Sequence, residues 1–219
     1  MKNITAVKIN NTRLRNNKLK RNILGYSRLD YIQKRAIDYI MVIVLFSIFW
    51  PIILYTIYRI KKESPGPIFF KQTRVGLNNK KFNCYKFRSM HTNSHFNPYT
   101  QDNDSRIFPF GHIMRKMRID ELAQLINVIK GDMHIVGPRA EWDILVNEYE
   151  NVIQNYNLRH TVKPGITGLA QVRYPYGRNV QDARKKLDYD IFYIKNWSLF
   201  LEIKVLFQTV AVILKRSGI

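Results

Sequence analysis

The most apolar segment of the chain runs from Tyr39 to Tyr58 and contains no charged residue. A helix of about twenty such residues is long enough to cross the hydrocarbon core of a bilayer. Pro51 lies in the middle of the segment. Because proline lacks the backbone N–H and clashes with the carbonyl four residues earlier, we expect the helix to break at Trp50 and Pro51.

Both ends of this segment are basic. Positive charges usually mark the cytoplasmic end of a spanning helix, and here both ends qualify. The sequence therefore predicts a re-entrant membrane helix over residues 34–62, which enters one leaflet, bends and leaves on the same side. A proline-kinked transmembrane helix fits the same composition. The flanking cations are Lys34, Arg35, Arg59, Lys61 and Lys62.

The remaining pattern predicts an α+β fold that is mostly helical: the re-entrant helix carries a small domain with a short β-hairpin and interfacial amphipathic helices. Alternating apolar residues predict two strands, 68–73 and 81–87, around a turn. Apolar periodicity predicts a helix over 120–130, with Gly131 as its stop. The helix over 200–214 fits either the membrane interface or the domain core. Other helices are expected over 111–118 and 187–193, and loops over 91–107, 136–139 and 163–168.

The charge balance implies an anionic partner. Thirty-six Lys and Arg residues against 16 Asp and Glu give a net charge of +20. Lipid head groups, a phosphorylated substrate or a nucleic acid would match this charge. We expect three parts: residues 1–33 as a flexible basic arm on anionic lipid, 34–62 as the membrane helix, and 63–219 as the membrane-associated domain. A merely solvated arm is the alternative. The lone Cys84 leaves no internal disulfide.

The adjacent carboxylates Asp120 and Glu121 are the first candidates for chemistry. They open a predicted helix, where the helix dipole favours an ionised carboxylate and attracts phosphate. One carboxylate could attack phosphorus while the other binds Mg²⁺, a cation that prefers oxygen ligands. The alternative is that Asp120 is a stabilising N-cap and Glu121 a first-turn carboxylate.

Basic residues in the expected loops are candidate substrate ligands. Arginine offers a planar fork that matches phosphate oxygens, although each of these side chains alone is also explained as a surface charge. The candidates are Lys86, Arg88, Arg115, Arg139, Arg159 and Lys163.

Asp102-Asn103-Asp104 has the D-x-D spacing of metal-dependent glycosyltransferases, but it lies in a polar stretch without a preceding hydrophobic strand. The five histidines lack zinc-site spacing, and neither nucleotide-binding glycine motif is present.

Taken in order, a long series of motifs resembles the monotopic phosphoglycosyl transferases of the bacterial sugar transferase family. The resemblance extends from Lys34 to Gly218. Its pieces are K-R-x-x-D from Lys34, F-x-Q-x-R-x-G from Phe70, Y-K-F-R-S-M from Tyr85, I-D-E-L-x-Q-L-x-N-V from Ile119, K-G-D-M from Lys130, V-G-P-R from Val136, R-H at Arg159, K-P-G-I-T-G-x-A-Q-V from Lys163 and Y-I-K-N from Tyr193.

This resemblance implies an enzyme that transfers a sugar 1-phosphate from a UDP-sugar to polyprenol (undecaprenyl) phosphate and releases UMP. It implies that Asp120 forms an aspartyl-phosphosugar intermediate and that Glu121 binds Mg²⁺. Arg115 and Arg139 would meet phosphate or nucleotide, with Lys86 as a further candidate. The family works on the cytoplasmic face of the bacterial inner membrane and begins capsule, O-antigen or glycoprotein glycan synthesis. Anionic lipid is expected as a partner, nucleic acid is not, and a homodimer is compatible with the sequence.

The chain departs from the family pattern at three places. Trp50-Pro51 stands where relatives have Ser-Pro, Ala123 replaces a common proline, and Arg173–Gly177 is an insertion relative to the smallest members. Larger relatives carry extra membrane helices and a soluble domain before this core, so the resemblance implies a catalytic core alone. Two alternatives stay open: a D-x-D glycosyltransferase, which would release UDP, and a non-catalytic basic membrane anchor or nucleic-acid binder.

Overall fold

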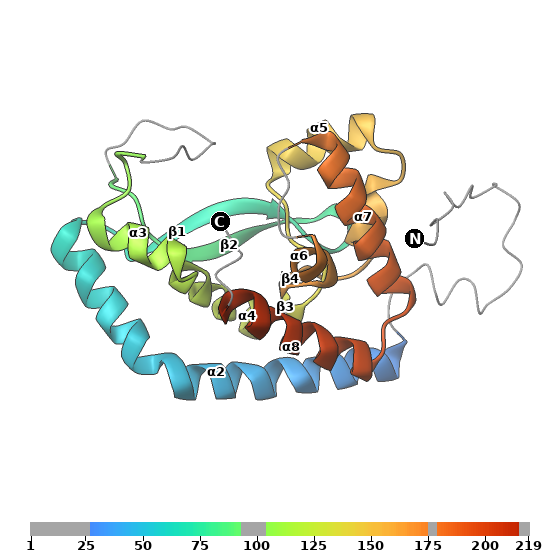
Figure 1. The fold of residues 1–219 in the computed structure, drawn as a ribbon, viewed down its shortest axis with the longest axis horizontal. Coiled ribbons are helices and arrows are strands. Elements are labelled where there is room, and N and C mark those ends of the chain that lie inside the picture. The colour runs from blue at the N-terminus through green and yellow to red at the C-terminus, as the bar shows by residue number, and fades with distance from the viewer. Residues whose placement is uncertain (1–26, 93–103, 175–178, 215–219) are drawn as a thin grey trace, which may run out of the picture.

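The computed structural model describes residues 27–92, 104–174 and 179–214. The described chain is mostly helical and has two small two-stranded sheets (Figure 1), which confirms the α+β prediction at this level. The helices are α2 (Arg28–Glu63), α3 (Pro109–Lys116), α4 (Leu125–Lys130), α5 (Asp143–Val152), α6 (Leu169–Arg173), α7 (Val180–Lys195) and α8 (Leu199–Leu214). Three 3₁₀ helices are η1 (Leu77–Asn79), η2 (Ile119–Gln124) and η3 (Tyr156–Thr161). The strands are β1 (Phe69–Val75), β2 (Lys81–Phe87), β3 (His134–Val136) and β4 (Gly165–Thr167).

Helix α2 is the apolar helix that the sequence predicts, and it starts earlier than residue 34. A capping box between Ser27 and Asp30 begins the helix at Arg28, because each side chain satisfies the other residue's backbone N–H. The helix continues through Pro51 to Glu63 and changes direction partway along (Figure 1). Proline is the usual cause of such a bend, since it removes one hydrogen bond of the helix. The helix is therefore bent and not interrupted.

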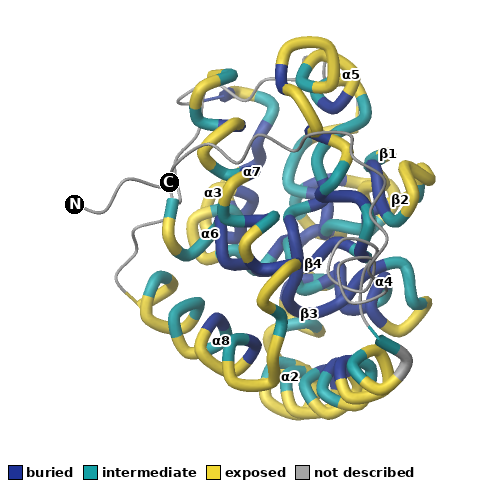
Figure 2. The backbone as a smooth tube through the Cα atoms, turned by 90° about the vertical axis from the view of Figure 1, so that its right-hand side faces the viewer, coloured by how far each residue is buried: buried dark blue, intermediate teal, exposed yellow. Residues whose placement is uncertain are grey.

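Both ends of α2 are attached to the same domain. Near the first end, Asp38 accepts a hydrogen bond of 2.8 Å from the backbone N–H of Ile135, in β3. At the other end, Glu63 accepts one of 2.8 Å from the N–H of Phe110, and Ile60 is buried. The intervening turns expose large apolar side chains on the side away from the domain, and exposed positions also line α8 (Figure 2).

The predicted hairpin is confirmed. Strands β1 and β2 pair antiparallel from Phe69↔Phe87 to Val75↔Lys81. The turn between them is η1, in which Asn78 has a positive φ of 54°, a conformation that asparagine tolerates well.

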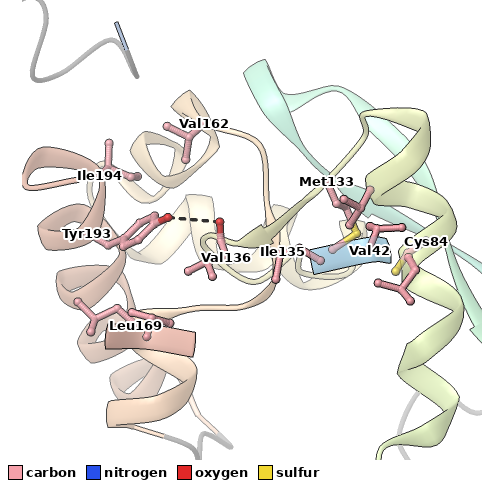
Figure 3. Packing of buried hydrophobic residues seen from close by; sticks show 12 residues of the cluster. Val42, Cys84, Met133, Ile135, Val136, Val162, Leu169, Tyr193 and Ile194 are labelled. Carbon is pink, nitrogen blue, oxygen red and sulfur yellow. Dashed lines mark hydrogen bonds between the residues drawn. The ribbon is translucent and has the colours of Figure 1, made fainter. Parts of the chain in front are cut away.

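The two glycine- and proline-rich stretches predicted as loops lie at a parallel strand pair: β4 falls inside 163–168, and β3 ends at Val136, where the other stretch begins. His134 pairs with Gly165, and Val136 pairs with Thr167. The backbones approach so closely that a Cβ on Gly165 would lie 2.0 Å from the nitrogen of Gly137. Only glycine fits there. The hydrophobic core surrounds this pair, and the Tyr193 hydroxyl points toward the Val136 carbonyl (Figure 3).

The other predicted helices lie close to where the sequence places them, but several differ from the prediction in length. The single helix expected over 120–130 is wrong, because η2 covers the carboxylates and α4 follows it. Gly131 ends α4 with a φ of 82°, as expected. Helix α7 extends well beyond the predicted 187–193, and α5 and η3 were not predicted. Helix α8 buries Glu202 and Val205 and exposes most of its other apolar side chains.

Candidate active site

Three separate parts of the chain meet at the Asp120–Glu121 pair. The two carboxylates lie on η2, which packs against strand β2. Strand β2 contributes Lys86, and the loop after β3 contributes Arg139. Arg118 precedes η2 in the left-handed conformation, with φ 55°. Such a backbone is uncommon outside glycine and is often found at functional sites.

Glu121 is surrounded by positively charged side chains. Its Oε1 lies 3.2 Å from an Nη of Arg139 and 3.4 Å from Nζ of Lys86. Its Oε2 lies 3.6 Å from an Nη of Arg118. The same Lys86 ammonium lies 3.8 Å from Oδ2 of Asp120. Lys86 therefore bridges the two carboxylates, whereas Arg139 pairs with Glu121 and not with Asp120.

The protein shifts the pKa values of the two neighbouring carboxylates in opposite directions. Burial raises the pKa of Asp120, whose exposed fraction is only 8%, and the nearby Lys86 and Arg115 offset part of that rise. The pKa of Glu121 is lowered, because the attraction of Arg139, Lys86 and Arg118 outweighs the effect of burial. The sequence predicted a carboxylate kept ionised by a helix dipole, but η2 is a short 3₁₀ helix and burial dominates at Asp120.

The backbone around Arg139 is fixed by hydrogen bonds to three successive carbonyls. The N–H of Gly165 donates to the Pro138 carbonyl at 2.9 Å. An Nη of Arg159 donates to the Arg139 carbonyl at 3.0 Å, and Arg74 donates to the Ala140 carbonyl. The Arg139 guanidinium then extends to Glu121, which raises the pKa of this arginine. Residues of β1, η3 and β4 thus hold the backbone segment from which the Arg139 side chain extends.

The structure separates the candidate basic residues into two groups. Lys86, Arg115 and Arg139 surround the carboxylates by contact or by electrostatic interaction with Asp120 or Glu121. Arg88 instead donates to the carbonyls of Ser64, Pro65 and Pro67 beyond the end of α2. Arg159 is buried behind Arg139, and Lys163 donates to the Tyr31 hydroxyl at 3.2 Å.

The structure describes only one of the three residues of the D-x-D candidate. Asp102 and Asn103 lie outside the described residues. Asp104 is buried and forms an ion pair of 2.5 Å with Arg106, two residues along the chain. This carboxylate is neutralised locally.

Four site residues were not singled out from the sequence. Arg74 and Arg118 lie inside or beside recognised motifs, so their positions could have suggested a role. Glu141 and Asp190 carried no signal, because their relation to Arg139 and Arg159 comes only from the fold.

The donor set fits Mg²⁺ bound together with substrate. Among the described residues, no group of three or more His, Cys, Asp or Glu side chains is placed to hold a metal. Mg²⁺ commonly takes one or two carboxylates, with phosphate oxygens and water completing its shell. Asp120 and Glu121 supply two adjacent carboxylates, and the lowered pKa keeps Glu121 ionised. A metal bound to this carboxylate pair would therefore need a phosphorylated substrate and water to complete its shell.

Comparison with known proteins gives a consistent picture. The family model described as "Bacterial sugar transferase" matches residues 29–216. A UDP-N-acetylgalactosamine-undecaprenyl-phosphate N-acetylgalactosaminephosphotransferase of Aeromonas hydrophila is 44% identical over 84% of this chain and 44% of its own length. A UDP-glucose:undecaprenyl-phosphate glucose-1-phosphate transferase of Xanthomonas campestris pv. campestris is 39% identical over 84% of this chain and 40% of its own length.

A third relative matches over nearly its whole length. It is a Bacillus subtilis protein described as an uncharacterized sugar transferase, EpsL, and is 40% identical over 86% of this chain and 90% of its own length. The chain spans less than half the length of the first two relatives. The family match covers the whole described site, from Arg74 on β1 to Asp190 on α7. The chain belongs to the bacterial sugar transferase family.

Proposed function

We propose that this protein is a phosphoglycosyl transferase that moves a sugar 1-phosphate from a UDP-sugar to undecaprenyl phosphate and releases UMP. The observation that carries the proposal is the buried Asp120 beside Glu121, with Lys86 and Arg139 against the pair, in a chain of this family. The names of two relatives, which describe transfer of this type to undecaprenyl phosphate, support the reaction class.

Asp120 is the proposed nucleophile. Its carboxylate oxygen attacks the phosphorus that bears the sugar, the bond to the bridging oxygen breaks, and UMP leaves with that electron pair. A phosphate oxygen of the lipid then attacks the same phosphorus and restores the carboxylate. Burial raises the pKa of Asp120, which makes the ionised carboxylate more basic and a better nucleophile. Dividing the transfer in two allows UMP to leave before the lipid reacts.

The surrounding cations offset the charge of the substrates. A carboxylate that approaches a diphosphate meets strong repulsion, and cations fixed at the site reduce it. Lys86 touches both carboxylates and Arg139 contacts Glu121, so both are within reach of a phosphoryl group bound there. Bound Mg²⁺ would neutralise further charge on the diphosphate, with Glu121 as its principal protein ligand.

We also propose that α2 is re-entrant and that the domain lies on the cytoplasmic face of the inner membrane. Among the described residues, one helix, Leu29–Glu63, is long and apolar enough to cross a membrane. Only 11% of its most apolar 18-residue stretch is buried in the protein. A core helix would be buried, so this exposure supports contact with lipid. Both ends of α2 bind one small domain, through Asp38 and Glu63, which supports a helix that returns to its starting side.

The deciding experiment mixes the enzyme with radiolabelled UDP-sugars in the absence of lipid acceptor. We expect up to one equivalent of UMP and label covalently bound to Asp120, with neither product from Asp120→Asn. Release of UDP would instead favour glycosyl transfer. If wild-type enzyme turned over with acceptor present but released no UMP and trapped no label without it, direct transfer would replace the two-step mechanism. Chelation with EDTA should stop turnover, and added Mg²⁺ should restore it.

A further inference from the structure

We propose that Arg159, held by Asp190, is a positioning residue that fixes the backbone of Arg139 and thereby places the Arg139 guanidinium on Glu121. This inference rests on the proposed function for its kinetic consequences, but its structural content does not depend on the reaction. It assigns Arg159 a role different from the substrate contact expected from the sequence.

The surroundings of Arg159 leave its guanidinium facing the protein interior. The side chain is 4% exposed. One Nη lies 2.8 Å from Oδ2 of Asp190, on α7, and donates to the Arg139 carbonyl at 3.0 Å. The other Nη donates to the Tyr156 hydroxyl at 2.5 Å and lies 3.9 Å from Oε1 of Glu141. A phosphate could approach this guanidinium only if these contacts were broken.

The contact to Arg139 has a direct geometric consequence. The Arg139 carbonyl accepts from Arg159 on one side, while the side chain of the same residue reaches Glu121 on the other, at 3.2 Å. Because the backbone is held at this residue, the direction of its Cα–Cβ bond is held, and the contact with Glu121 orients the guanidinium at the far end of the side chain. Shifting one residue by about 1 Å at a catalytic site can reduce a rate about 100-fold.

The negative charge of Asp190 offsets the repulsion between Arg159 and Arg139. Arg159 and Arg139 are adjacent cations, and burying two like charges together is unfavourable without counter-ions. Asp190 faces Arg159, and Glu141 interacts with both arginines. Removal of the Asp190 charge should therefore push Arg159 away from the Arg139 carbonyl.

The test is a double-mutant cycle on UMP release, measured per folded molecule. Arg159→Lys keeps the charge but loses the planar fork, and we expect about a tenfold lower rate. In an Arg139→Lys background the same change should add less than a twofold loss, since the side chain that it positions is already altered. Asp190→Asn should behave in the same way. Arg88→Lys is the matched control: it alters another buried arginine bound to carbonyls, and its effect should multiply with that of Arg139→Lys.

Hydrogen exchange supplies a readout that does not need activity. The amides of Val75 and Gly165 donate to the carbonyls of Glu141 and Pro138, in the same loop. Both amides should exchange faster in Asp190→Asn than in wild type, while those of β2 stay unchanged. Multiplicative losses in the cycle, or unchanged exchange at both amides, would overturn the inference. A wild-type protein that released no UMP would contradict the proposed function, and the exchange result would still decide the positioning role.

Discussion

Nζ of Lys34, on α2, lies 2.5 Å from Oε1 of Glu202, on α8, and neither side chain is exposed. The same ammonium donates to the Val136 carbonyl at 2.7 Å and to the Tyr193 hydroxyl at 2.9 Å. Tyr193 and Trp197 donate to the other oxygen of Glu202, at 2.6 and 2.9 Å. Buried charges are tolerated when they are paired and fully hydrogen-bonded. This pair therefore ties the first half of α2 to the domain.

Replacing Lys34 with Met should destabilise the protein by about 3–5 kcal/mol, because Glu202 is left as an unpaired buried charge. Adding Glu202→Gln should recover part of this loss, since the amide oxygen can still accept from Tyr193 and Trp197. Lys204→Met, at an exposed position of α8, is the control and should change stability by less than about 0.5 kcal/mol. Chemical unfolding in detergent measures all three. A double variant less stable than Lys34→Met would contradict the pairing.

The two neighbouring carboxylates should have opposite effects on stability at neutral pH. The folded-state pKa of Asp120 is raised, so its ionisation costs stability that is regained as the pH falls through that pKa. Asp120→Asn should therefore stabilise at pH 7, by about 0.5–2 kcal/mol, and the gain should shrink toward pH 4. The pKa of Glu121 is lowered, so its charge contributes stability that is present above the unfolded-state pKa and lost as the pH falls through the folded one.

Accordingly, Glu121→Gln should destabilise at pH 7, by about 1–3 kcal/mol, because Arg139, Lys86 and Arg118 lose their counter-ion. Unfolding curves of both variants between pH 4 and pH 7 provide the comparison. Equal effects of the two substitutions would be inconsistent with the different environments of these carboxylates.

Gly165→Ala should be far more damaging than Gly131→Ala. A Cβ on Gly165 would lie 2.0 Å from the Gly137 nitrogen, and backbone atoms cannot move aside separately. We expect a loss of at least about 3 kcal/mol and of UMP release, since the loop that carries Arg139 is displaced. Gly131 has a positive φ, but a Cβ there would make only ordinary contacts, the nearest at 3.7 Å from Nζ of Lys163, so alanine should cost about 1 kcal/mol. Thermal unfolding and activity per folded molecule would separate the two cases, and equal losses would count against the close approach.

The topology of α2 can be tested with single cysteines in a Cys84→Ser background. Ile32 and Lys62 lie near opposite ends of the helix and are exposed. A membrane-impermeant thiol reagent added to intact cells should label neither position, and permeabilisation should make both reactive. Pro51→Leu should straighten the helix and make one end reactive from outside, whereas the control Ile48→Leu should leave both protected. Labelling of one end in the otherwise unchanged protein would show that the helix spans the membrane.

The elements whose structure is set by residues close together in the sequence could be predicted from the sequence. The apolar length of α2, the hairpin of β1 and β2, and the end of α4 at Gly131 all follow from patterns within a few residues. The carboxylate pair could also be located, because its residue types and its place beside a helix suggest phosphate chemistry. These features reflect local backbone preferences and the periodicity of apolar side chains.

The contacts that each basic residue makes were decided by the tertiary structure. Arg139 and Arg159 are both motif arginines, yet one contacts Glu121 and the other is buried behind it. Lys34 was read as a flank of a membrane helix, but its ion-pair partner lies 168 residues away. The energy of a charge depends on which groups surround it and on how far it is removed from water. Those surroundings exist only after β3 and β4 pair and α7 and α8 pack beside them, so no local pattern could reveal them.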